Sequence, residues 1–161
     1  MGLDMYLYVD EYVSRKHWDK RDDNGDAVNN PQFETIASVL QSTKHMQEDS
    51  WTGLTIQVPV GYWRKANAIH GWIVQNYADG VDECQEIGLP RVALEDLVNT
   101  CKKVLVNPDY ADELLPPQSG FFFGSTQVDE YYIHDLKYTI ELLEGLLKDE
   151  ALDWFIYRAS W

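Results

Sequence analysis

The chain contains few cysteines, few basic residues and no long apolar run. Cys84 and Cys101 are the only two cysteines in 161 residues. The opening residues carry an acid at Asp4 and lack the apolar run of a secretory signal. Two cysteines without such a signal predict reduced thiols and a cytoplasmic protein. No stretch reaches the 18 or so apolar residues that would predict a membrane span.

Basic residues are outnumbered by acidic ones. The chain has 13 Lys and Arg against 27 Asp and Glu, a formal charge of −14. Phosphate groups are repelled by such a surface, so we expect no direct nucleic-acid partner and no binding to anionic membranes. An acidic protein of this kind is suited instead to protein partners, or to a ligand held at a local cluster of cations.

The patterns of common cofactor and metal sites are also missing. There is no Gly-Lys-Ser/Thr phosphate loop, no dinucleotide fingerprint and no Gly-x-Ser-x-Gly nucleophile elbow. Residues 19–26 resemble a calcium loop, but alignment on Gly25 places Lys20 at the first ligand. Glu130 and His134 share a helix face without a second histidine. We therefore expect no metal and no cofactor.

The residues that are present predict one folded domain, residues 1–161. Hydrophobic residues make up 45% of the chain and aromatic residues 13%, which is enough for a core without disulfides or metal. Alternation predicts strands over residues 3–13, 54–60 and 154–157, and the first and last strands are expected to pair. The second is predicted to be an edge strand because it contains Pro59.

Helical periodicity predicts four helices. We expect them over residues 31–40, 62–79 and 90–106, and from a cap at residues 126–129 to Leu147. Asn24-Gly25 indicates a hairpin turn. The connection over residues 107–126 is long enough to be functional or to contain short elements. The predicted fold is α+β: a small, mainly antiparallel sheet packed with about four helices.

Two blocks stand out chemically, and the first is the segment over residues 62–72. In the predicted helix, Trp63, Asn67 and His70 lie on one face, and Arg64 and Lys65 lie in the first turn. Cations beside free helix N–H groups predict an anion site. The alternative is that the aromatic residues belong to the core and the cations pair with surplus acids.

The second block is the segment over residues 116–126. Gly120 and Gly124 bracket three phenylalanines, and two prolines stiffen the entry. Hydroxyls at Ser125 and Thr126 precede a predicted helix, where backbone donors collect. We interpret this block as a binding loop with aromatic walls. A buried Phe-rich strand followed by an ordinary helix cap is the alternative.

Three sequence runs, MGLDMYL, YWRKANAIHGW and LLPPQSGFFFGST, carry a resemblance that extends over nearly the whole chain. They resemble a family of small uncharacterised proteins encoded mostly by tailed bacteriophages and prophages, and by some bacteria. The resemblance implies a phage accessory protein that acts in the bacterial cytoplasm, and it implies no mechanism. It includes the two blocks singled out above, which favours a shared site.

Three hypotheses of function follow. The first is a non-catalytic binder of an anionic, nucleotide-like ligand or of a host defence component. The second is an enzyme acting on a phosphorylated or nucleotide substrate, with His70 as acid or base and Arg64 as charge stabiliser. The third is an acidic inhibitor of a host protein, including a nucleic-acid mimic; the oligomeric state is left open. The predicted ligand-binding residues are Tyr62, Trp63, Arg64, Lys65, Asn67, His70, Gln118, Ser119, Phe121, Phe123, Ser125 and Thr126.

Overall fold

The structure is a computed structural model that describes residues 2–46, 53–121 and 123–161. Its contacts group the chain into two compact units. Unit 1 comprises residues 1–9 and 59–161, and unit 2 comprises residues 10–58. The polar residues 46–53 predict a loop between the first helix and the second strand, and most of this segment lies outside the described residues.

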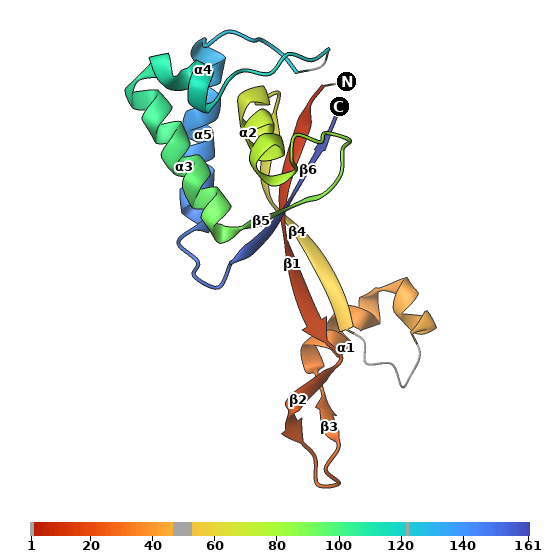
Figure 1. The fold of residues 1–161 in the computed structure, drawn as a ribbon. Helices are drawn as coiled ribbons and strands as arrows, with labels where there is room; N and C mark the ends of the chain where they lie inside the picture. Colours follow the sequence, from red (N-terminus) through yellow and green to blue (C-terminus); the bar gives the residue numbers. More distant parts are fainter. Residues whose placement is uncertain (1, 47–52, 122) are drawn as a thin grey trace. The chain divides into compact units, whose positions relative to one another are not determined.

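A four-stranded sheet organises unit 1, in the order β4-β1-β6-β5 (Figure 1). The strands are β1 (Asp4–Ser14), β4 (Gly53–Arg64), β5 (Ile87–Pro90) and β6 (Trp154–Ser160). β6 pairs antiparallel with both β1 and β5, so the predicted pairing of the first and last strands is confirmed. β4 lies at the edge, where Pro59 needs no ladder partner on its outer side.

Helices supply the rest of unit 1. They are α2 (Asn67–Tyr77), α3 (Arg91–Val106), the 3₁₀ turn η2 (Pro108–Tyr110), α4 (Ala111–Leu114) and α5 (Glu130–Leu146). Every second residue of β1 from Met5 to Val9 is buried, as the alternation predicts. These side chains join apolar residues of α2, α3 and α5 in one core.

Unit 2 contains the outer parts of β1 and β4 and four short elements. These are β2 (Lys16–Arg21), β3 (Ala27–Asn29), α1 (Pro31–Val39) and the 3₁₀ helix η1 (Gln41–His45). β2 and β3 form the predicted hairpin, with Gly25 at a φ of +87° in its turn. The side chain of Asn30 caps α1 through the N–H of Gln32, also as predicted.

The predicted helix over residues 62–79 is wrong at its start. β4 continues through Tyr62, Trp63 and Arg64, which are exposed, buried and exposed in turn. Lys65, at a φ of +61°, turns the chain, and α2 begins at Asn67. Because the sheet buries Trp63 on its inner face, strand pairing overrides the helical spacing of this segment.

The start of α5 needs a second correction. Its N-cap is Asp129, whose carboxylate accepts the backbone N–H groups of Tyr131 and Tyr132, and the predicted cap at Thr126 precedes the helix. The connection over residues 107–126 contains η2 and α4. Five α-helices are thus found in the described part of the chain, and the predicted α+β class with a mainly antiparallel sheet is confirmed. Within residues 2–46, 53–121 and 123–161, no helix has the length and apolar character to cross a membrane.

Candidate functional site

The two chemically distinctive blocks meet at Asn67. Its side-chain oxygen accepts the backbone N–H of Gln118 at 2.9 Å, and its amide nitrogen donates to the carbonyls of Phe123 and Ser125 at 2.9 Å each. Asn67 is buried. The segment over residues 116–126, here called the strap, is therefore held to the start of α2 by three hydrogen bonds from one side chain.

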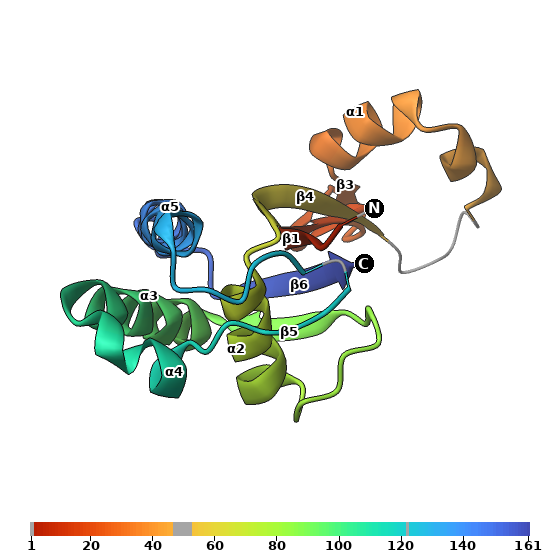
Figure 2. The ribbon, with the colours of Figure 1, turned by 90° about the horizontal axis from the view of Figure 1, so that it is seen from above.

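A close contact between Gly71 and Gln118 fixes the strap one turn further along α2. A Cβ added at Gly71 would lie 2.3 Å from Cγ of Gln118, which is inside van der Waals contact. This explains a glycine in the middle of a helix, where it costs up to about 1 kcal/mol relative to alanine. The strap leaves α4, passes α2 and returns to α5 (Figure 2).

Two pockets are lined in part by the strap. The first, here called the Arg64 pocket, has a volume of about 390 Å³. It is lined by Arg64, Lys65, Ala66, Asn67, Ala68, Ile69, Gly124, Ser125, Gln127, Asp129, Tyr131, Tyr132, Asp135 and Leu136. The second, here called the His70 pocket, has a volume of about 890 Å³ and uses the later turns of α2 and the first half of the strap.

Positive charge and free backbone donors gather at the Arg64 pocket. Arg64 is exposed, and its Nε atom lies 4.0 Å from the carboxylate of Asp4. α2 has no side-chain cap, and the N–H groups of Ala68 and Ile69 find no acceptor within residues 2–46, 53–121 and 123–161. Such uncapped N–H groups carry the positive end of the helix dipole, which favours an anion.

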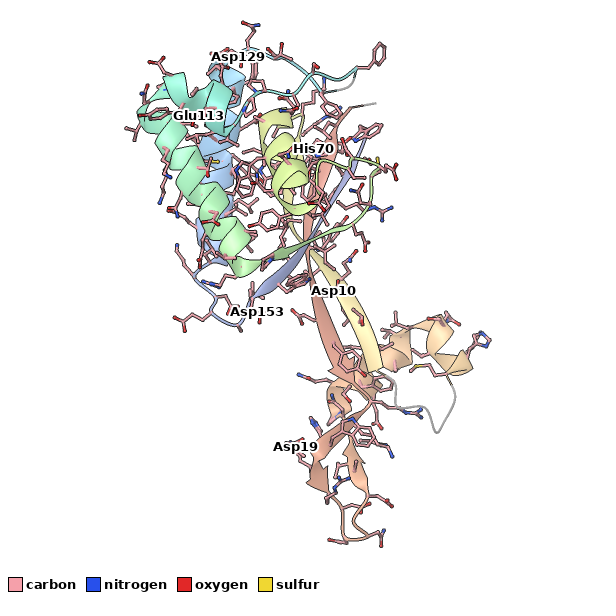
Figure 3. The ribbon with its side chains drawn as sticks, in the orientation of Figure 1. Asp10, Asp19, His70, Glu113, Asp129 and Asp153 are labelled. Atoms are coloured by element: carbon pink, nitrogen blue, oxygen red, sulfur yellow. The ribbon has the colours of Figure 1, made fainter. Side chains whose placement is uncertain are left out.

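Two carboxylates also line this pocket, and their pKa values are shifted in opposite directions. Asp129 (labelled in Figure 3) is engaged as the cap of α5, and the N–H of Tyr132 is the main cause that lowers its pKa. Burial raises the pKa of Asp135 to about 6, against a smaller opposing effect of His134. Below that pH the pocket therefore loses one negative charge and keeps both cations.

His70 is held by protein groups on both sides. Its Nε2 lies 2.9 Å from Oδ2 of Asp82, and its Nδ1 lies 2.7 Å from the hydroxyl of Tyr157. An ionised carboxylate only accepts, so Nε2 carries a proton, and in the neutral ring Nδ1 accepts from the tyrosine. Burial raises the pKa of Tyr157 well above its ordinary value, so this hydroxyl stays protonated.

This arrangement bears on the predicted catalytic role of His70. The side chain is only 2% exposed, and both ring nitrogens are engaged. A general acid or base must reach its substrate with a free nitrogen or through water. His70 is therefore placed as a link between α2, β6 and the acidic connector over residues 81–86, and the geometry does not favour its use as a catalyst.

The predicted ligand-binding residues divide between the two pockets. Arg64, Lys65, Asn67 and Ser125 line the Arg64 pocket, whereas His70, Gln118, Ser119, Phe121 and Phe123 line the His70 pocket. The other three, Tyr62, Trp63 and Thr126, line neither. The two blocks are thus adjacent and both contribute to each pocket, so the residues predicted to form one site are divided between two cavities.

Two of the residues outside the pockets have other partners. The buried indole of Trp63 donates to the hydroxyl of Thr139 at 2.9 Å, so little of it is available to a ligand. Tyr62 lies beside Tyr6, with ring centroids 5.1 Å apart. Its hydroxyl donates to Asp4, and this bond is the first cause that raises the pKa of Tyr62.

Sequence reasoning missed Asp82, Tyr131, Asp135 and Trp161 as pocket residues. Asp82 lies in an acidic run with nothing to mark it as the partner of His70. Tyr131 could have been found from the sequence, because packing does not explain a tyrosine in the exposed first turn of a helix. Its side chain is 72% exposed in the structure.

Metal binding has no support in the part of the chain that the structure describes. There, no group of three or more His, Cys, Asp or Glu side chains is placed to hold an ion.

Comparisons with protein-family models, with curated proteins and with solved structures give no match. The function is accordingly argued from the geometry of the two pockets.

Proposed function

We propose that this chain is a phage- or prophage-encoded accessory protein that binds a small anionic, nucleotide-like ligand without transforming it. The phage setting rests on the three sequence runs quoted above. The binding role rests on the Arg64 pocket. A host protein, bound directly or through the ligand, is the partner class that the acidic surface also allows.

One observation carries the proposal: two cations and the uncapped start of α2 line the same pocket. Arg64 and Lys65 supply charge, and the N–H groups of Ala68 and Ile69 supply directional donors. In a chain with a formal charge of −14, this concentration of donors suits a phosphate or carboxylate group.

The walls of the pocket suit the rest of a nucleotide-like ligand. Tyr131 offers an exposed ring on which a base or sugar can pack, and Ser125 and Gln127 offer polar contacts. A volume of about 390 Å³ lies at the lower end of the range of small-molecule sites, so the pocket fits a mononucleotide better than a larger ligand.

We propose binding without a reaction because of the side chains that surround Arg64 and Lys65. The titratable groups lining this pocket besides the cations are Asp129, Asp135 and two tyrosines. Asp129 is engaged as a cap, and burial raises the pKa of Tyr132, whose hydroxyl donates to the carbonyl of Leu115. The described residues of the lining include no histidine and no cysteine, so the pocket offers no Ser–His or Cys–His pair for nucleophilic catalysis.

Calorimetric titration of the purified chain tests the proposal, with pyrophosphate, AMP and adenosine as probes. The titrations are run near pH 5, where Asp135 is mostly neutral. We expect AMP and pyrophosphate to bind and adenosine to bind at least tenfold more weakly, because a charge-assisted hydrogen bond contributes about 1.5–3 kcal/mol.

A pair of matched variants locates the site. Arg64→Gln should weaken AMP binding about tenfold or more, for the same reason. Arg158→Gln removes the same charge from an exposed position on β6 that lines neither pocket, and it should leave the affinity unchanged. Equal affinities in both variants, or no binding of either anion, would contradict the proposal and shift attention to a host protein.

A further inference from the structure

The His70 pocket differs from the Arg64 pocket in the sign of its charges. Among the described residues that line it, the titratable side chains apart from His70 are Asp82 and Glu113, and none is a lysine or arginine. Glu113 lies on α4 and is exposed, and Figure 3 labels it together with His70. This pocket therefore repels the anions that the Arg64 pocket attracts.

Asp82 is fixed in position by two neighbours. Its Oδ2 accepts from Nε2 of His70, and its Oδ1 lies 3.3 Å from the indole nitrogen of Trp161. The side chain nevertheless remains 27% exposed. A carboxylate held in this way keeps its orientation toward the pocket and loses little entropy when a positive group approaches.

Aromatic rings form the second component of the wall. Trp72, Phe123 and Trp161 line the pocket together. The rings of Phe123 and Trp161 are in edge-to-face contact with centroids 6.1 Å apart, and Phe123 lies edge-to-face with His70 at 5.4 Å. Such rings present negative faces that attract a cation.

We propose that the His70 pocket is a binding site for a small organic cation, in particular an alkylated ammonium group. Aromatic faces bind the apolar, weakly hydrated surface of such a cation, and Asp82 and Glu113 balance its charge. A bare metal ion is a poorer fit, because the described part of the lining has no third carboxylate side chain and the rings offer no ligand atoms. This site is independent of the anion site proposed above.

The test compares choline with 3,3-dimethylbutan-1-ol, which has the same shape and no charge. Binding to the full chain is followed by calorimetry and by quenching of tryptophan fluorescence. We expect choline to bind about fivefold more tightly than the neutral alcohol, since a cation over aromatic rings gains about 1 kcal/mol. Tetramethylammonium should behave like choline. Equal binding of choline and the alcohol, or no binding of either cation, overturns the proposal.

Matched variants assign the binding to this pocket. Glu113→Gln and Trp161→Leu should each weaken choline binding about threefold or more. Glu141→Gln removes an acid from an exposed position on α5 that lines neither pocket, and it should have no effect. Arg64→Gln should also leave choline binding unchanged, so that failure of the anion site and failure of this site are separate results. Loss of choline binding in Glu141→Gln to the same extent as in Glu113→Gln would overturn the assignment.

Discussion

Asn67 lines the Arg64 pocket, and it also has partners in the structure that the sequence does not indicate. A polar side chain between two cations and a histidine was predicted to contact a ligand. In the structure it joins the strap to α2 through three hydrogen bonds to backbone groups. Its partners lie 51, 56 and 58 residues away in the chain, so no local pattern could have identified them.

Asp135 allows a prediction about pH and stability. Because burial raises its pKa from 3.8 to about 6, the folded protein holds a proton between those values that the unfolded chain has already lost. Its carboxyl group therefore lowers the free energy of unfolding progressively as the pH rises through this window. Asp135→Asn should raise that free energy by about 1–3 kcal/mol at pH values above the window.

Urea denaturation at a series of pH values checks this. The gain in the free energy of unfolding from Asp135→Asn should shrink as the pH falls through about 6. It should vanish below 3.8, where the carboxyl group of Asp135 is protonated in both the folded and the unfolded chain. Glu130→Gln, a neighbouring exposed acid in the first turn of α5, serves as the comparison. A gain for Asp135→Asn that is independent of pH would show that its proton is not responsible.

At the scale of elements, the periodic segments were predictable and the junctions were not. The alternation of β1 and the apolar stripe of α3 repeat over many residues, so each is specified several times. The junction between β4 and α2 depends on one residue, Lys65, whose N–H donates to the carbonyl of Leu3, the residue directly before β1. Apolar spacing in residues 62–72 fits both periods, and strand pairing decides between them.

The contact between the strap and α2 gives a prediction in the form of a double-mutant cycle. Gly71→Ala should stabilise an isolated helix by up to about 1 kcal/mol. Here the added Cβ would meet Cγ of Gln118 at 2.3 Å, so the single variant should gain nothing or lose stability. In a Gln118→Ala background the obstruction is removed and the gain should reappear. Denaturant unfolding of the four proteins measures the coupling, and a value near zero would contradict this account.

The whole molecule contains two units with unequal apolar burial. Among the described residues of unit 2, Phe33 is the only buried apolar side chain. The core formed by the sheet and the helices α2, α3 and α5 lies in unit 1. No proline- or glycine-rich linker in the sequence marks the division. The prediction of one domain over residues 1–161 was based on composition and length, which carry no information about how contacts are distributed.

This inequality predicts the order of local opening. Because burial of apolar surface is the main source of stability, amides of unit 2 should exchange with solvent at lower denaturant concentrations than those of β6 and α3. Hydrogen exchange followed by mass spectrometry at several guanidinium concentrations measures this. Simultaneous loss of protection in peptides from residues 15–45 and from residues 91–106 would instead show a single cooperative transition.

The position of unit 2 within the chain has one more consequence. The chain leaves unit 1 along β1 and re-enters it along β4, and these strands are neighbours in the sheet. The chain thus leaves and re-enters on adjacent strands, and neighbouring strands of a sheet lie about 4.8 Å apart. Unit 2 is in this sense an insertion in a hairpin. Since the entropy of closing a loop grows only slowly with its length, the segment can be shortened, extended or exchanged in related chains while the hydrogen bonding of unit 1 is preserved.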